Sequence, residues 1–128
     1  MRRTGWNNAH ARRRAQRRGL LAEWLCLWHL RLHGWHILAR GWRCPSGEID
    51  ILARRGKVLA VIEVKSRGEL AVAASALAPR QRRRIARAAE AFLTQRSDLA
   101  ALDLRFDMML VAPLHLPRHW HGAWRTDD

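Results

Sequence analysis

Three charged residues stand out because they lie within segments that are otherwise strongly apolar. Asp50 lies in EIDILA (residues 48–53), and Glu63 and Lys65 lie in VLAVIEVKSR (residues 58–67). A carboxylate that is buried without compensation costs several kcal/mol, so charges within apolar strands require a partner. The sequence therefore directs attention to chemistry that two carboxylates and one amine can perform together.

Two carboxylates on neighbouring strands can hold one divalent cation. A tight turn at residues 54–57 joins the two segments, so Asp50 and Glu63 can be cross-strand neighbours about 5 Å apart at Cβ. Mg²⁺ takes oxygen ligands at about 2.1 Å and keeps positions for water and phosphate oxygens. Lys65 shares a face with Glu63 and can orient a water molecule or stabilise phosphoryl charge. The pattern suits metal-dependent phosphodiester hydrolysis. The alternative is a solvent-facing sheet side on which Glu63, Lys65 and Arg67 form ordinary ion pairs.

The elements that must position these residues follow an α/β order. Apolar periodicity predicts a helix at residues 20–32. Its expected buried face consists of Leu21, Trp24, Leu25, Trp28 and Leu32. Strands are predicted at residues 35–43, 48–53, 58–67 and 104–112, with Ile49 and Ile51 on one face of the second strand. A second helix is predicted to begin at Pro79, and the tail from Pro113 has room for one more short strand.

The charge of the chain indicates a polyanionic partner. The 128 residues carry 24 Lys and Arg against 11 Asp and Glu, a formal net charge of +13, and suffice for one domain. Residues 1–18 are rich in arginine without an acidic residue and are predicted to form a basic arm ahead of a domain at residues 19–128. Nucleic acid is the expected partner, in preference to a membrane surface.

The apolar segment at residues 20–32 is neither a membrane span nor a signal peptide by its composition. It contains Glu23, His29 and Arg31, is short for a bilayer, and has no small-residue cleavage site. Two cysteines, Cys26 and Cys44, do not constitute a disulfide framework. We therefore expect a soluble cytoplasmic protein.

The order of several segments resembles that of the YraN family of small bacterial proteins. The matching segments are GWHILARGWR (34–43), GEIDILA (47–53), VIEVKSR (61–67), QRRRIARAAEAFL (81–93) and RFDMMLV (105–111). The resemblance covers most of the chain, from about residue 19 to residue 111. YraN proteins are similar to archaeal Holliday-junction resolvases and belong to the PD-(D/E)xK nuclease superfamily.

The resemblance implies a restriction-endonuclease-like fold, a small mixed sheet flanked by helices, and it assigns roles to residues. Asp50 and Glu63 would be ligands of Mg²⁺ or Mn²⁺, and Lys65 would be the motif lysine. Glu23, on the first helix, takes the family's further acidic position and would also reach the metal; on spacing alone it could equally be a partly exposed residue paired with arginine. Glu48 would have a supporting role.

The function implied is a metal-dependent endonuclease that hydrolyses phosphodiester bonds in DNA, including branched DNA. Because resolvases of this kind cut as dimers, a homodimer is expected. The alternative is an accessory protein that binds nucleic acid and keeps the nuclease fold without cutting. The residues expected to contact phosphates are Arg67, Arg80, Gln81, Arg83, Arg84 and Arg87.

Three weaker signals have less specific interpretations. Cys26, His29, His33 and Cys44 could together bind zinc, but the spacing matches no common zinc motif and packing is favoured. Trp24, Trp28 and Trp35 are expected in the core, and Trp120 and Trp124 are candidate platforms for stacking bases. Asp107 is expected to form a salt bridge rather than bind a metal.

Overall fold

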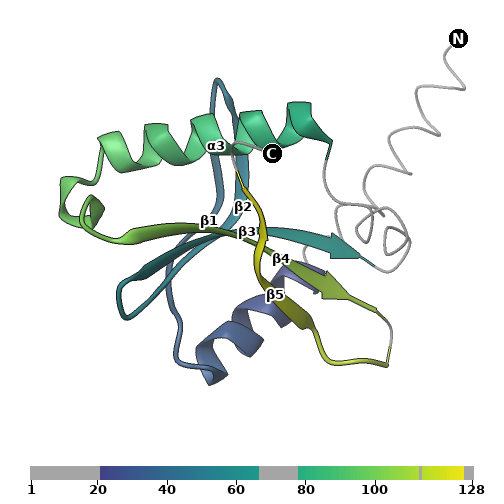
Figure 1. Ribbon diagram of the computed structural model, residues 1–128. Helices are drawn as coiled ribbons and strands as arrows, with labels where there is room; N and C mark the ends of the chain where they lie inside the picture. Colours follow the sequence, from purple (N-terminus) through teal and green to yellow (C-terminus); the bar gives the residue numbers. More distant parts are fainter. Residues whose placement is uncertain (1–20, 67–77, 113, 126–128) are drawn as a thin grey trace, which may run out of the picture.

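A computed structural model describes residues 21–66, 78–112 and 114–125, and its centre is one five-stranded sheet (Figure 1). The strands follow chain order across the sheet, and only β3 and β4 are parallel neighbours. They are β1 (His36–Cys44), β2 (Gly47–Arg55), β3 (Val58–Ser66), β4 (Asp103–Val111) and β5 (Arg118–Trp124). The predicted strands are thereby confirmed within one or two residues, and the tail supplies β5.

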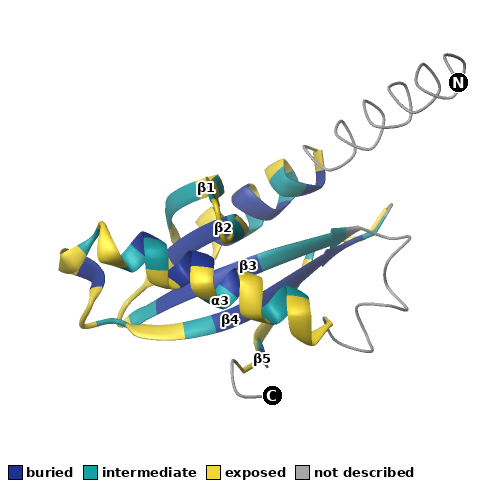
Figure 2. Cartoon of the chain, turned by 90° about the horizontal axis from the view of Figure 1, so that it is seen from above, coloured by how far each residue is buried: buried dark blue, intermediate teal, exposed yellow. Residues whose placement is uncertain are grey.

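Helices cover both faces of the sheet. The helix at residues 21–32 lies on one face, and α3 (Pro79–Thr94) lies on the other (Figure 1). A short 3₁₀ helix, η2 (Ser97–Leu99), follows α3 and leads into β4. Buried positions concentrate on the strands and on the sheet-facing sides of the helices (Figure 2). This is the mixed, helix-flanked α/β arrangement of the restriction-endonuclease-like fold.

The α3 helix forms as its sequence predicts. Pro79 occupies the first turn, where its missing N–H costs nothing. Ile85, Ala88, Ala89 and Phe92 recur at helical spacing and are the buried residues of the helix. They pack on the sheet residues Leu52, Leu59, Val61 and Met108, among others. Because α3 lies in the connection between the parallel strands β3 and β4, it is the crossover helix of a βαβ unit.

Two tight turns build the three-stranded β1–β2–β3 meander. Cys44 pairs with Gly47 and Arg55 pairs with Val58, so each turn contains two residues. Gly56 opens the second turn at φ 60°, the left-handed conformation that type II′ hairpins require and that glycine adopts without strain. The predicted hairpin at residues 54–57 is therefore confirmed.

The predicted buried face of the helix at residues 21–32 is wrong at four of its five residues, and only Leu25 packs against the core. Leu21, Trp24, Trp28 and Leu32 are between 46% and 79% exposed. The buried side consists instead of Ala22, Cys26, Leu27 and Leu30. Both sides of this helix are apolar, so periodicity alone could not choose between them, and the side with the smaller residues lies against the sheet.

Strand β2 leaves β3 at Asp50, and this divergence sets the geometry of the candidate site. Pairing of β2 with β3 extends only from Arg55↔Val58 to Ile51↔Ile62, whereas β1 stays paired with β2 as far as Gly47. The β1–β2 turn rises beside α3 (Figure 1), where a Cβ on Gly47 would lie 3.2 Å from the Arg84 carbonyl oxygen.

The divergence also corrects the predicted alternation in β2. Ile49 packs in the core under α3, whereas Ile51 packs in the core under the helix at residues 21–32. The two isoleucines therefore do not share a face, because the strand changes direction between them. Regular alternation holds only where β2 remains paired with β3 on one side and β1 on the other.

Candidate functional site

Asp50 lies in the opening between β2 and β3. Its Oδ2 accepts a hydrogen bond of 2.8 Å from the backbone N–H of Val64, beyond the last backbone pair of the two strands. A side chain thus satisfies a strand N–H that the diverging backbone no longer reaches. This bond fixes the Asp50 carboxylate against β3.

Glu63 meets Asp50 in the same opening, and each side chain shifts the pKa of the other. Burial, together with the negative charge of Asp50, raises the pKa of Glu63 to about 8. Burial also raises the pKa of Asp50, although the Val64 N–H opposes this by stabilising the carboxylate. Glu63 therefore tends to keep its proton near neutral pH, and two oxygen-bearing groups meet in a poorly solvated place.

Lys65 and Gln81 complete the surroundings of Glu63. Lys65 Nζ lies 3.9 Å from Glu63 Oε1, and the two side chains are only 18% and 12% exposed. Gln81, on α3, donates from Nε2 to the same Oε1 at 3.3 Å. Glu63 and Lys65 thus form a mostly buried contact on the α3 side of β3, which differs from the solvent-facing ion pairs of the alternative interpretation.

Glu23 reaches the neighbourhood of Asp50 from the other helix. Burial raises the pKa of Glu23, the charges of Asp50 and Glu48 raise it further, and Arg40 opposes the shift. Among the described residues, however, Glu23 does not join Asp50 and Glu63 in a group of three ligand atoms within 4.8 Å of one another. Its place fits an auxiliary acid at the edge of the site.

Glu48 lies further out. Its side chain is half exposed and forms an ion pair of 3.4 Å with Arg43 of β1. Its charge still raises the pKa of Asp50 and of Glu63, after larger contributions from burial. Glu48 is thus a surface acid near the β1–β2 turn that influences the carboxyl pair only through its charge.

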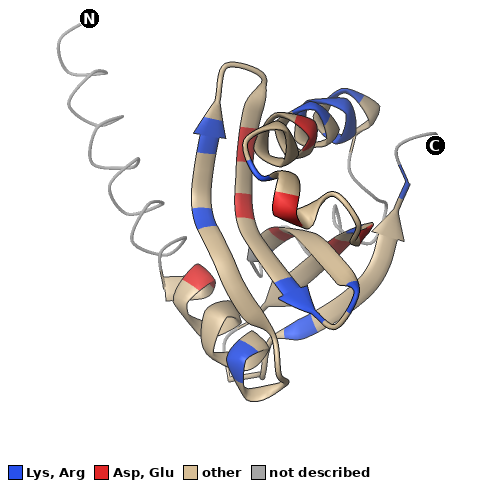
Figure 3. Cartoon of the chain, turned by 90° about the vertical axis from the view of Figure 1, so that its left-hand side faces the viewer, with Lys and Arg blue, Asp and Glu red and all other residues tan. Residues whose placement is uncertain are grey.

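The basic residues of α3 lie beside the site. Gln81 is half-buried, and Arg80, Arg83, Arg84 and Arg87 are exposed. Figure 3 shows basic positions gathered along α3. Arg67 and the predicted basic arm at residues 1–18 lie outside the described residues. The arginines of α3 that are expected to contact phosphates are thus exposed to solvent. Gln81 is instead half-buried and hydrogen-bonded to Glu63.

Cys26, His29, His33 and Cys44 do not come together as a zinc site. This agrees with the interpretation, favoured from the sequence, that these residues serve in packing. Cys26 is fully buried in the core under the helix at residues 21–32, whereas Cys44 packs against the core under α3. Burial raises the pKa of the Cys26 thiol to about 12, which disfavours the thiolate that zinc requires.

The buried and exposed tryptophans are not all those that the sequence predicted. Trp35 is buried as expected, but Trp24 and Trp28 are about half exposed and lie edge to face, with ring centroids 6.0 Å apart. Trp124, a predicted stacking platform, is buried and stacks on Phe106, with 4.2 Å between centroids. Trp120 remains 39% exposed.

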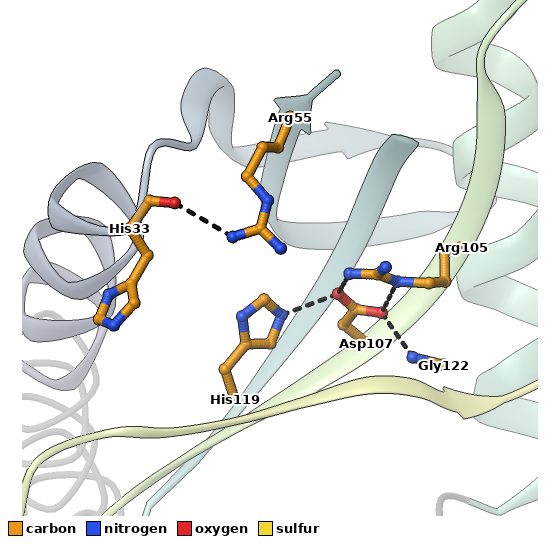
Figure 4. A network of polar contacts seen from close by, with 6 residues as sticks. All are labelled: His33, Arg55, Arg105, Asp107, His119 and Gly122. Carbon is orange, nitrogen blue, oxygen red and sulfur yellow. Dashed lines mark hydrogen bonds and ion pairs between the residues drawn. The ribbon is translucent and has the colours of Figure 1, made fainter. Parts of the chain in front are cut away.

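A second polar cluster centres on Asp107, which is fully buried (Figure 4). Arg105 binds both of its carboxylate oxygens at 2.8 Å, and His119 Nε2 lies 2.7 Å from Oδ2. The salt bridge expected for Asp107 is confirmed, but the sequence did not predict its histidine partner. Asp107, His119 and His121 offer ligand atoms within 4.8 Å of one another. The His-x-His spacing on β5 was the signal that could have indicated this cluster.

No described helix is both long and apolar enough to cross a membrane. This agrees with the expectation that residues 20–32 do not span a membrane, as far as the described residues 21–32 are concerned.

Comparison with known proteins identifies relatives over nearly the whole chain. The sequence profile described as "Uncharacterised protein family UPF0102" matches residues 22–111. The "UPF0102 protein amb4503" of Paramagnetospirillum magneticum is 51% identical over 123 residues, 93% of this chain and 95% of the relative. A "UPF0102 protein" of Parvibaculum lavamentivorans is 52% identical over 111 residues, 87% of this chain and 84% of the relative. "UPF0102 protein Mmar10_3014" of Maricaulis maris is 46% identical over 118 residues, 92% of this chain and 93% of the relative. The chain therefore belongs to family UPF0102, the YraN family that its motifs indicated.

Proposed function

We propose that this protein is a metal-dependent endonuclease that hydrolyses phosphodiester bonds in DNA, with branched DNA as the first substrate to test. The observation that carries the proposal is the meeting of Asp50, Glu63 and Lys65 where β2 leaves β3. A buried carboxyl pair beside a lysine is costly for stability alone. It is well suited to an active site that a cation completes.

The donor set fits a hard divalent ion. Asp50 and Glu63 supply carboxylate oxygens, which suit Mg²⁺ and Mn²⁺, and no thiol or imidazole belongs to the pair. Asp50 and Glu63, with Glu23 as auxiliary acid, would hold such an ion, which would supply Lewis-acid activation of a phosphodiester and of water.

The protein groups around the pair have separate tasks. The Val64 N–H holds the Asp50 carboxyl group against β3 and opposes the rise in its pKa, and the Gln81 amide donates a hydrogen bond to Glu63 from α3. The Lys65 ammonium group can orient the attacking water and stabilise negative charge on the phosphoryl group as the bond breaks. The exposed arginines of α3 supply positive charge for the DNA backbone beside this opening.

Activity should be measured on a labelled four-way junction and on a linear duplex of the same sequence, with and without Mn²⁺. Asp50→Asn and Lys65→Ala should each abolish metal-dependent cutting, by a factor of about a hundred or more. Asp98→Asn is the matched control, because Asp98 is an exposed carboxylate paired only locally with Arg96. It should cut like the unchanged protein.

The test also separates the alternative function. Binding of the junction by all variants, without cutting at any Mn²⁺ concentration, would instead establish an accessory protein that binds nucleic acid.

Since the proposed cutting of a junction requires two symmetric incisions, we also propose that the working form is a homodimer. Light scattering with and without the junction would detect it.

A further inference from the structure

Four histidines gather on the sheet face that carries the helix at residues 21–32, apart from the Asp50 and Glu63 pair. His29 and His33 stack on the helix with ring centroids 4.2 Å apart. His119 and His121 on β5 lie edge to face at 4.3 Å, and both contact the ring of buried Trp35. Burial, followed by the charges of His33 and His119, lowers the pKa of His29.

Asp107 is an anchor in this cluster, because both of its oxygens are already occupied. Oδ1 accepts hydrogen bonds of 2.8 Å from Arg105 Nε and the Gly122 backbone N–H. Oδ2 accepts one from Arg105 and lies 2.7 Å from His119 Nε2 (Figure 4). A carboxylate held this way is not free to leave Arg105 for a cation, but it can fix the orientation of the imidazole that binds it.

The contact with Asp107 determines what His119 can offer. Since Nε2 donates its proton to the carboxylate, the other ring nitrogen, Nδ1, keeps a free lone pair. Figure 4 shows that second nitrogen turned away from Asp107. A carboxylate that orients a histidine in this manner is the usual outer partner of a histidine that binds a metal.

His121 supplies a second imidazole at a suitable separation. The ligand atoms of Asp107, His119 and His121 all lie within 4.8 Å of one another. Two nitrogens that bind one tetrahedral ion at about 2.0–2.1 Å are about 3.4 Å apart, so a rotation of the exposed His121 ring can bring them together. The buried Nδ1 of His29 has no hydrogen-bond partner among the described residues, but His29 does not join His119 and His121 in a group of ligand atoms within 4.8 Å of one another.

We propose that His119 and His121 form a second metal site for a transition-metal ion of the zinc class, with Asp107 as the residue that positions His119. Imidazole nitrogens favour Zn²⁺, Co²⁺, Ni²⁺ or Cu²⁺ over Mg²⁺, so this site differs in chemistry from the carboxylate pair. The site does not depend on the proposed nuclease activity.

The test uses Co²⁺ as a spectroscopic probe and the full chain, with any polyhistidine tag removed. Titration should give saturable visible absorption bands with one strong equivalent of Co²⁺, and Zn²⁺ should displace it. His121→Ala is the principal variant, because His121 is exposed and its loss leaves the Asp107 contacts intact. It should weaken Co²⁺ binding at least tenfold.

Three further variants define the site. Asp107→Asn should weaken Co²⁺ binding by about 10 to 100 times, as expected for an outer partner. His115→Ala, an exposed histidine in the connection before β5, and Asp98→Asn, an exposed carboxylate paired with Arg96, should each bind Co²⁺ like the unchanged protein. If Co²⁺ fails to saturate the unchanged protein, or if His121→Ala and a folded His119→Ala bind Co²⁺ as tightly as it does, the proposal is wrong.

Discussion

Asp50 and Glu63 form a coupled pair of carboxyl groups at the point where β2 leaves β3. The divergence of the strands creates the space, and the Val64 N–H that loses a backbone partner becomes the donor that holds Asp50. Glu63 follows on the neighbouring strand and keeps a proton because it is buried beside this carboxylate. The geometry of the sheet therefore determines the protonation state of the site.

Binding of Mn²⁺ should become tighter as the pH rises toward 8. Burial and the Asp50 charge raise the pKa of Glu63 to about 8, so the proton on Glu63 must leave before both carboxylates can bind a cation. Below that pH, each unit of acidification should weaken the apparent affinity by up to about tenfold. Calorimetric titrations in buffers of different ionisation enthalpy would measure the released proton. Affinity that does not change with pH, without proton release, would contradict this protonation state.

Glu63→Gln should stabilise the metal-free protein at alkaline pH. The pKa of Glu63 is raised in the folded state to about 8, so the folded protein binds more protons than the unfolded chain between about pH 4.5 and 8. Stability from this group is therefore present at low pH and is lost as the pH rises through 8. Glutamine does not ionise, so the Glu63→Gln variant does not lose this stability as the pH rises. Its free energy of unfolding at alkaline pH should therefore exceed that of the unchanged protein by about 1 kcal/mol or more.

Urea unfolding at about pH 5.5 and pH 9, with a chelator present, would measure this difference. Glu90→Gln, an exposed glutamate of α3, is the matched control and should show no pH-dependent advantage over the unchanged protein. Equal stability of Glu63→Gln and the unchanged protein at both pH values would refute the prediction.

Asp107→Asn should be strongly destabilising. The substitution leaves Arg105 without its ionic partner in a mostly buried position, and loss of one partner from a buried pair costs about 3–5 kcal/mol. Burial alone would raise the pKa of Asp107, but hydrogen bonds from His119, Arg105 and Gly122 hold it at about 2. The stability that Asp107 contributes is therefore present above about pH 4 and is lost as the pH falls toward 2. Thermal unfolding between those pH values, compared with the exposed Asp98→Asn, would measure both effects.

Trp28→Ala should change stability far less than Trp35→Ala. Trp28 is 46% exposed on the outer side of its helix, whereas Trp35 is 3% exposed in the core. Loss of a buried aromatic side chain costs about 3–5 kcal/mol, and an exposed one typically costs less than about 1 kcal/mol. Chemical denaturation of the two variants would test the corrected orientation of the helix. Comparable losses from both would favour the orientation that the apolar periodicity first predicted.

The sequence correctly predicted the features that are determined by short segments of the chain. The Gly56 turn, the Pro79 helix start and the alternation of β3 each follow from a short segment, and all agree with the structure. The site was predictable because the hairpin fixes the distance along the chain between Asp50 and Glu63. The motif and the family resemblance then gave these two carboxylates and Lys65 a role.

Features that depend on contacts distant in sequence were not predictable. The helix at residues 21–32 has two apolar sides, and only the sheet decides that Ala22 and Cys26 lie inward. Strand β2 changes direction at Asp50, and the adjoining β1–β2 turn approaches Arg84 of α3, a contact between residues distant in sequence. His119 and Asp107 lie 12 positions apart on strands whose pairing was not predicted from the tail.

The meander has a further consequence for the order in which the protein folds. Val64 and Asp50 are separated by 14 positions along the chain, whereas the pairing of β3 with β4 must wait for the longer connection through α3 to close. The carboxyl pair is thus brought together early, while little else is present to offset its repulsion. Protons or divalent cations should therefore act on the rate of folding as well as on the finished structure.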